Sequence, residues 1–104
     1  MRLNGTQKDI LRRAADLLDA PENRTTGVLA RDYVGRSCSS SDGACWCAEG
    51  AIFKLVRASG MGAMYAVELV NSISDTMGRR VACVWDSGVD GQEEVLSVMR
   101  KLAA

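Results

Sequence analysis

The sequence contains no histidine and a single proline, and aromatic residues make up only 5% of its 104 positions. The absence of histidine removes the side chain that most often serves as a general base or a metal ligand. No apolar run approaches the roughly 20 residues of a membrane-spanning helix, and residues 1–9 lack the apolar stretch of a secretory signal. These absences argue against an enzyme and against a membrane protein, and they predict a cytoplasmic location.

Neither sign of charge is in excess. Thirteen Lys and Arg residues balance thirteen Asp and Glu residues. General nucleic-acid binding is therefore not expected, because it depends on a basic surface that releases counterions from the phosphates. The length has room for one domain, and the fractions of 47% hydrophobic and 25% charged residues are typical of globular proteins. We expect one domain, 1–104.

Apolar residues recur at helical spacing in four segments, which lie at about 7–19, 44–58, 63–77 and from residue 90 onward. Pro21 follows the first segment and Gly78 follows the third, as is typical of helix ends. We expect side chains to cap the starts of the first, second and fourth segments, namely Thr6, Asp42 and Asp90.

Residues 79–85 are rich in β-branched and aromatic side chains and predict a short strand. This strand could pair with residues 27–35, which could themselves be a strand or a hairpin. The predicted fold class is mainly α, with about four helices and a small two-stranded β element. An α+β fold is the alternative.

Residues 22–43 show no helical periodicity, and residues 37–43 are nearly all small and polar. We interpret 22–43 as an irregular, partly extended arm that ends in a mobile loop. Loops of this length are uncommon in compact domains and often carry function. The arm is therefore the first place to search for a site.

Four cysteines are the right number for a tetrahedral zinc site: Cys38, Cys45, Cys47 and Cys83. Their spacings of seven, two and thirty-six positions do not resemble the paired C-x2-C of zinc ribbons. A helix start close to Cys45 and Cys47 could lower a thiol pKa, but no histidine is present to act as a base. We favour buried or loop thiols and expect no metal and no cofactor. A cysteine or zinc enzyme is the least favoured alternative.

Small side chains occur at helical spacing at Cys47, Gly50 and Ala51. This spacing predicts a tight contact with another helix of the domain. Trp46 would point away from that patch in a helix, and it suits a surface or a core equally well. Trp85 is expected to make a structural contact at the end of the predicted strand, where Asp86 would accept a turn hydrogen bond.

Several stretches, taken in order, resemble an uncharacterised domain family that occurs in actinobacterial chromosomes and bacteriophage genomes. The most specific of them is W-C-A-x-G-A, which is Trp46-Cys47-Ala48-Glu49-Gly50-Ala51 here. The others are 10–18, 27–35, and Trp85-Asp86 with 93–96. The family tends to have Trp-Asn-Asp where this chain has Trp85-Asp86-Ser87. The resemblance implies a bacterial or viral source and an accessory role, and it names no reaction.

We therefore expect a non-enzymatic protein that acts by stoichiometric binding to a host or viral protein. The expected contact residues are Arg31, Tyr33, Arg36 and Trp46. The resemblance suggests antagonism of a host defence such as CRISPR as one such role, and a homodimer is a further possibility.

The alternative is a nucleotide-binding protein, in which arginines hold the phosphates and Trp46 or Tyr33 stacks on the ring. The arginines would be Arg31, Arg36, Arg79 and Arg80.

Overall fold

The computed structural model describes residues 3–104, which form five α-helices and one two-stranded antiparallel sheet. The helices are α1 (Gly5–Asp19), α2 (Ala48–Ala58), α3 (Ala63–Met77), α4 (Val81–Asp86) and α5 (Val89–Ala103). The strands are β1 (Ala30–Arg31) and β2 (Cys45–Trp46), and two 3-10 turns are η1 (Pro21–Asn23) and η2 (Ser40–Asp42). The predicted class, mainly α with a small two-stranded element, is confirmed.

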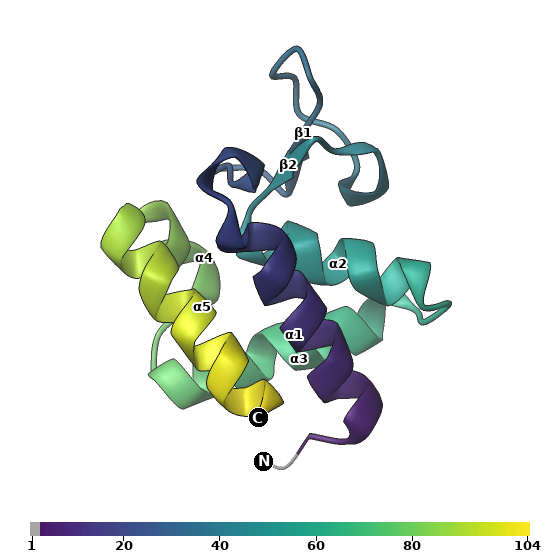
Figure 1. Cartoon of the computed structure of the whole chain (residues 1–104), viewed down its shortest axis with the longest axis vertical. Coiled ribbons are helices and arrows are strands. Elements are labelled where there is room, and N and C mark those ends of the chain that lie inside the picture. Colours follow the sequence, from purple (N-terminus) through teal and green to yellow (C-terminus); the bar gives the residue numbers. More distant parts are fainter. Residues whose placement is uncertain (1–2) are drawn as a thin grey trace.

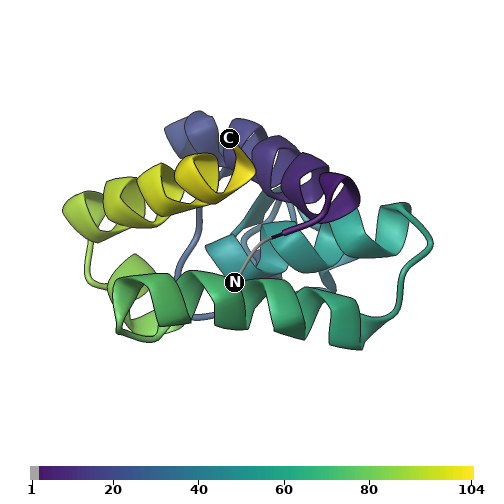
Figure 2. The same cartoon turned by 90° about the horizontal axis from the view of Figure 1, so that it is seen from below.

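The helices enclose one apolar core. Helices α1 and α5 lie antiparallel and in contact (Figure 1), and α3 lies on the opposite side of the molecule (Figure 2). Each long helix turns an apolar stripe inward, as its spacing predicts. Trp85 of α4 is the largest fully buried side chain in this core. None of the helices within residues 3–104 combines the length and the hydrophobicity that crossing a membrane requires.

Helix starts differ from the predicted caps. Asn4 caps α1 in place of Thr6, because its side chain accepts from Gln7 N at 2.8 Å while Asn4 N donates to Gln7 Oε1 at 2.9 Å. Cys47 caps α2 in place of Asp42, and its Sγ accepts from Gly50 N at 3.3 Å. Residues 44–47 are consequently not helical, contrary to the prediction.

The start of α5 and the end of α3 were also predicted from the sequence. Gly88 precedes α5 without a side-chain cap, so the predicted cap at Asp90 is wrong, and Asp90 lies in the first turn. Gly78 ends α3 with a φ of 70°, in the left-handed region that favours glycine, as expected.

The two-stranded element exists, but the predicted partner strand is wrong. Residues 81–86 form helix α4, and β1 pairs with β2 in the register Ala30↔Trp46 and Arg31↔Cys45. Val81, Val84 and Trp85 are all buried. Their spacing of three and four residues puts them on one face of a helix, and burial of that face outweighs the strand preference of the residues themselves.

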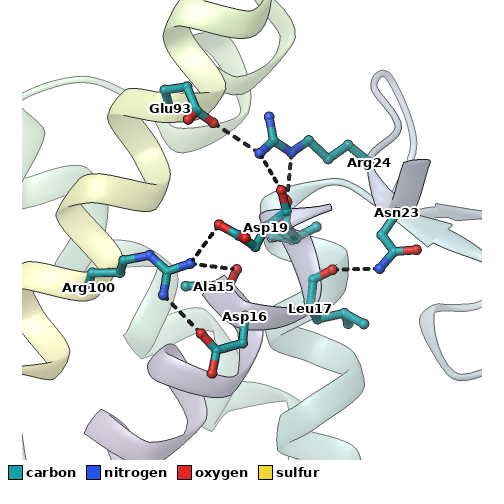
Figure 3. A network of polar contacts seen from close by, with 9 residues as sticks. Ala15, Asp16, Leu17, Asp19, Asn23, Arg24, Glu93 and Arg100 are labelled. Atoms are coloured by element: carbon teal, nitrogen blue, oxygen red, sulfur yellow. Dashed lines mark hydrogen bonds and ion pairs between the residues drawn. The ribbon is translucent and has the colours of Figure 1, made fainter. Parts of the chain in front are cut away.

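Arg24 fastens the start of the arm to the helices (Figure 3). Its side chain is only 9% exposed, and its guanidinium donates to Leu18 O at 2.7 Å and to Asp19 O at 3.2 Å. It also pairs with Glu93 of α5 at 3.0 Å. Close by, Arg100 of α5 pairs with two carboxylates of α1, those of Asp16 and Asp19. These contacts join the start of the arm, α1 and α5 to one another.

Candidate functional site

The loop of residues 32–36 follows β1 and stands apart from the helices, at the top of the molecule in Figure 1. Its turn is closed by Asp32, whose Oδ1 accepts from Val34 N at 3.0 Å and from Arg36 N at 2.9 Å. Backbone bonds join Asp32 N to Arg36 O and Gly35 N to Asp32 O. Gly35 has a φ of +87°, which a residue with a side chain rarely adopts. The backbone of this loop is consequently held in one shape.

Arg31 supports the same loop from its base. Its guanidinium donates to Thr25 Oγ1 at 3.0 Å, to Gly35 O at 3.1 Å and to Thr26 O at 3.4 Å. We expected Arg31 to contact a partner or a phosphate. These three bonds within the chain make Arg31 a brace of the loop, and its contact with a partner stays a prediction.

Tyr33 and Val34 occupy the tip of the loop and are 97% and 74% exposed. Arg36 is exposed beside them. Of the four expected contact residues, Tyr33 and Arg36 therefore lie where a partner could reach them. Sequence reasoning missed the role of Asp32, although Asp followed three positions later by glycine is a typical turn signal.

Trp46 does not belong to this surface. It is only 6% exposed, and its indole Nε1 donates to Ser40 O at 2.8 Å. The possibility of an exposed Trp46 assumed that residue 46 lies in a helix. It lies in β2 instead, where Trp46 joins the core and holds η2 against it.

The patch of Cys47, Gly50 and Ala51 is tightly packed, but the partner at Gly50 is not a helix. A Cβ on Gly50 would lie 1.8 Å from Leu29 O, and Cys47 N donates to that same oxygen at 3.1 Å. Ala51 is fully buried. The small side chains thus let the arm backbone lie directly against the start of α2, and the expected helix–helix contact at Gly50 is wrong.

A pocket of about 230 Å³ opens where the arm, the start of α2 and helix α4 meet. Trp85 closes part of it, with its indole donating to Thr25 O at 2.7 Å, and Asp86 Oδ1 accepts from Gly27 N at 3.3 Å. The turn hydrogen bond expected of Asp86 thus crosses from α4 to the arm. The lining residues come from three stretches of the chain, 27–29, 47–49 and 81–86. All three overlap stretches in which the sequence resembles an uncharacterised family.

No three of the cysteines come together within residues 3–104. Burial raises the pKa of the Cys47 thiol, and the carboxylates of Glu49 and Asp86 raise it further against the opposing bond from Gly50 N. Cys83 is exposed on α4. Between residues 3 and 104, no three cysteine or acidic side chains are placed to hold a metal ion.

The arginines of the nucleotide hypothesis are also not assembled at a pocket. Arg79 pairs with Glu94 of α5, and Arg80 precedes α4. Neither they nor the arginines of the arm line the 230 Å³ pocket. The phosphate-binding cluster that the sequence suggested is thus not seen around that pocket.

Comparison with known proteins gives a family and no function. Residues 3–104 match a family of unknown function (DUF6197), which confirms the resemblance to an uncharacterised domain family. No curated protein and no solved structure matches the chain.

Proposed function

The chain belongs to this family of unknown function, and we propose that it is a non-enzymatic binding protein of the bacterial cytoplasm that holds a protein partner through the loop 32–36. One observation carries the proposal. Tyr33 and Val34 are 97% and 74% exposed at the tip of a loop whose backbone is held by Asp32 and Arg31.

An exposed aromatic on a fixed loop is well suited to binding. Tyrosine is among the residues that dominate binding energy at protein interfaces, because it buries a large area with few rotatable bonds. A loop that is already ordered loses little conformational entropy on association. Tyr33 and Val34 would therefore enter an apolar socket of the partner at low cost.

The charged residues near the tip of the loop indicate which charge the partner carries around its socket. The Asp32 carboxylate is engaged by backbone N–H groups of its own loop, whereas Arg36 is exposed. Arg36 forms no ion pair with a carboxylate of residues 3–104, so its positive charge is open to a partner beside Tyr33. We expect an acidic group next to the socket of the partner, since opposite charges across an interface favour association.

The test compares three tagged proteins as baits in a bacterial host lysate: the wild type, the double variant Tyr33→Ser with Val34→Ser, and the control Met64→Ser. Met64 is also a large exposed apolar residue, at 68%, but lies on α3. Proteins captured by the wild type and the control but lost by the loop variant are the expected result. Calorimetry with the purified partner should then show a loss of affinity of about thirtyfold or more for the loop variant.

A further variant separates the shape of the loop from its side chains. Asp32→Ala removes the acceptor for Val34 N and Arg36 N but keeps Tyr33, so affinity for the partner should fall because the loop must be ordered on binding.

Equal capture by the wild type and the loop variant would refute the proposal. A bound nucleotide in the native mass spectrum without any macromolecule would favour the alternative instead. A captured defence protein, such as a CRISPR effector, would support the antagonist role, and capture of the chain itself would indicate a homodimer.

A further inference from the structure

The pocket between the arm, α2 and α4 has a lining of one chemical character. Apart from two acidic residues, the side chains that line it are apolar or belong to the Cys47 thiol, and no Lys or Arg is among them. Its volume of about 230 Å³ lies below the range of roughly 300 to 1,000 Å³ that is usual for drug-sized ligands. Any occupant is therefore small.

Glu49 and Asp86 supply the formal charge of the pocket. Neither carboxylate pairs with an Arg or Lys of residues 3–104. Asp86 accepts one backbone bond, from Gly27 N, and Glu49 lies in the first turn of α2. Both carboxylates are close enough to raise the pKa of Cys47, which also lines the pocket. The formal charge of the residues that line the pocket is thus negative.

Two amide groups at the start of α2 are already bonded within the chain. Free N–H groups at a helix N-terminus attract anions. Here Gly50 N is taken by Cys47 Sγ, and Cys47 N is taken by Leu29 O. An anion would find these two donors occupied and two carboxylates nearby.

From this arrangement we propose that the pocket binds a small organic cation, an ammonium group on a short apolar body. The ammonium lies between the carboxylates of Glu49 and Asp86, and the hydrocarbon body lies against Val28, Ala82 and the edge of Trp85. This site is separate from the loop 32–36, so it does not depend on the proposed protein binding.

The first experiment uses the wild-type protein and three probes of similar shape: benzylammonium, benzyl alcohol and benzoate. Amide chemical shifts in ¹H–¹⁵N spectra are followed to millimolar probe concentrations. Benzylammonium should give saturable shifts at Gly27, Ala48, Glu49 and Ala82, and these shifts should weaken as sodium chloride is added. Benzyl alcohol should bind less tightly, and benzoate should not bind.

The second experiment removes the charges one at a time. Glu49→Gln and Asp86→Asn should each raise the dissociation constant of benzylammonium by about fivefold, the upper range for a solvent-accessible ion pair. Asp75→Asn, which changes an exposed carboxylate of α3, is the control and should leave the dissociation constant of benzylammonium unchanged. Ala82→Leu should block the pocket by filling it.

Three outcomes would overturn the proposal: similar affinity for all three probes, saturable shifts at residues outside the pocket, or no saturable shift with benzylammonium. The probe comparison needs no variant, so it decides the matter even if a substitution disturbs folding. Tyr33→Ser with Val34→Ser should bind benzylammonium normally, which keeps this result distinct from that of the protein-binding test.

Discussion

At the scale of single residues, Gly50 shows how the absence of a side chain can decide a contact. The backbone oxygen of Leu29 occupies the space in which a Cβ of residue 50 would lie. Helical spacing correctly marked Cys47, Gly50 and Ala51 as a place of close approach. The spacing could not show that the approaching group at Gly50 is the backbone of the arm, because a pattern within one segment does not identify which distant residue packs against it.

Gly50→Ala tests this contact. Alanine favours a helix by about 1 kcal/mol over glycine, but here the added methyl group forces Leu29 away and strains its bond with Cys47 N. We expect a net loss of about 1 to 3 kcal/mol in the free energy of unfolding, as is usual for an overpacked core. Urea unfolding, monitored by circular dichroism, measures this loss of stability.

Gly5→Ala is the matched control, because a Cβ on Gly5 at the start of α1 would meet no atom within 4 Å. Its stability should be unchanged or slightly higher. If Gly50→Ala were as stable as Gly5→Ala, the close approach of Leu29 would be wrong.

At the scale of elements, α4 shows that burial can outweigh the strand preference of individual residues. Its residues are β-branched or aromatic at three of six positions, yet a helix puts Val81, Val84 and Trp85 together against the core. The start of the arm is held by Arg24, which bonds to the end of α1 and pairs with Glu93 of α5. Arg24 supplies hydrogen bonds to the last carbonyls of α1, which has no basic residue in its own final turn.

Arg24→Met should therefore destabilise the fold. The carbonyls of Leu18 and Asp19 lose their donor near the surface of the core, and we expect a loss of about 1 to 3 kcal/mol in the free energy of unfolding. The same change at Arg79 removes an ion pair whose two side chains are 56% and 40% exposed, with Glu94. Arg79→Met should thus cost at most about 1 kcal/mol.

Denaturant melts of both variants, recorded under the same conditions, give the comparison. Equal stabilities for Arg24→Met and Arg79→Met would mean that the arm does not depend on Arg24.

At the scale of the whole molecule, arm and helices share one core. Ala30 and Trp46 of the sheet belong to the same buried cluster as the inward faces of the five helices. The radius of gyration is 12.3 Å, close to the roughly 13 Å expected for a compact domain of this length, although the loop 32–36 projects.

The arm and the helices should accordingly unfold together, as the single domain predicted from the length would. Trp46 lies in β2 beside the arm, and the indole of Trp85 donates to Thr25 O of the arm, so both tryptophans report on how the arm is attached to the helices. Tryptophan fluorescence should therefore change at the same denaturant concentration as the helical circular dichroism signal. A fluorescence change that precedes the loss of helix would show that the arm opens independently.

The sequence by itself determined the long helices and the place of the arm. Helical periodicity depends on residues three or four apart, so α1, α3, α5 and most of α2 could be read from neighbours along the chain. The turn that displays Tyr33 is local too, since Asp32 and Gly35 lie within five residues of each other. Contacts between distant residues were decided only by the tertiary structure. They bury Trp46, pair β1 with β2, turn residues 81–86 into a helix, and bring Glu49 and Asp86 to one pocket, because each of these outcomes depends on which surfaces meet when the core closes.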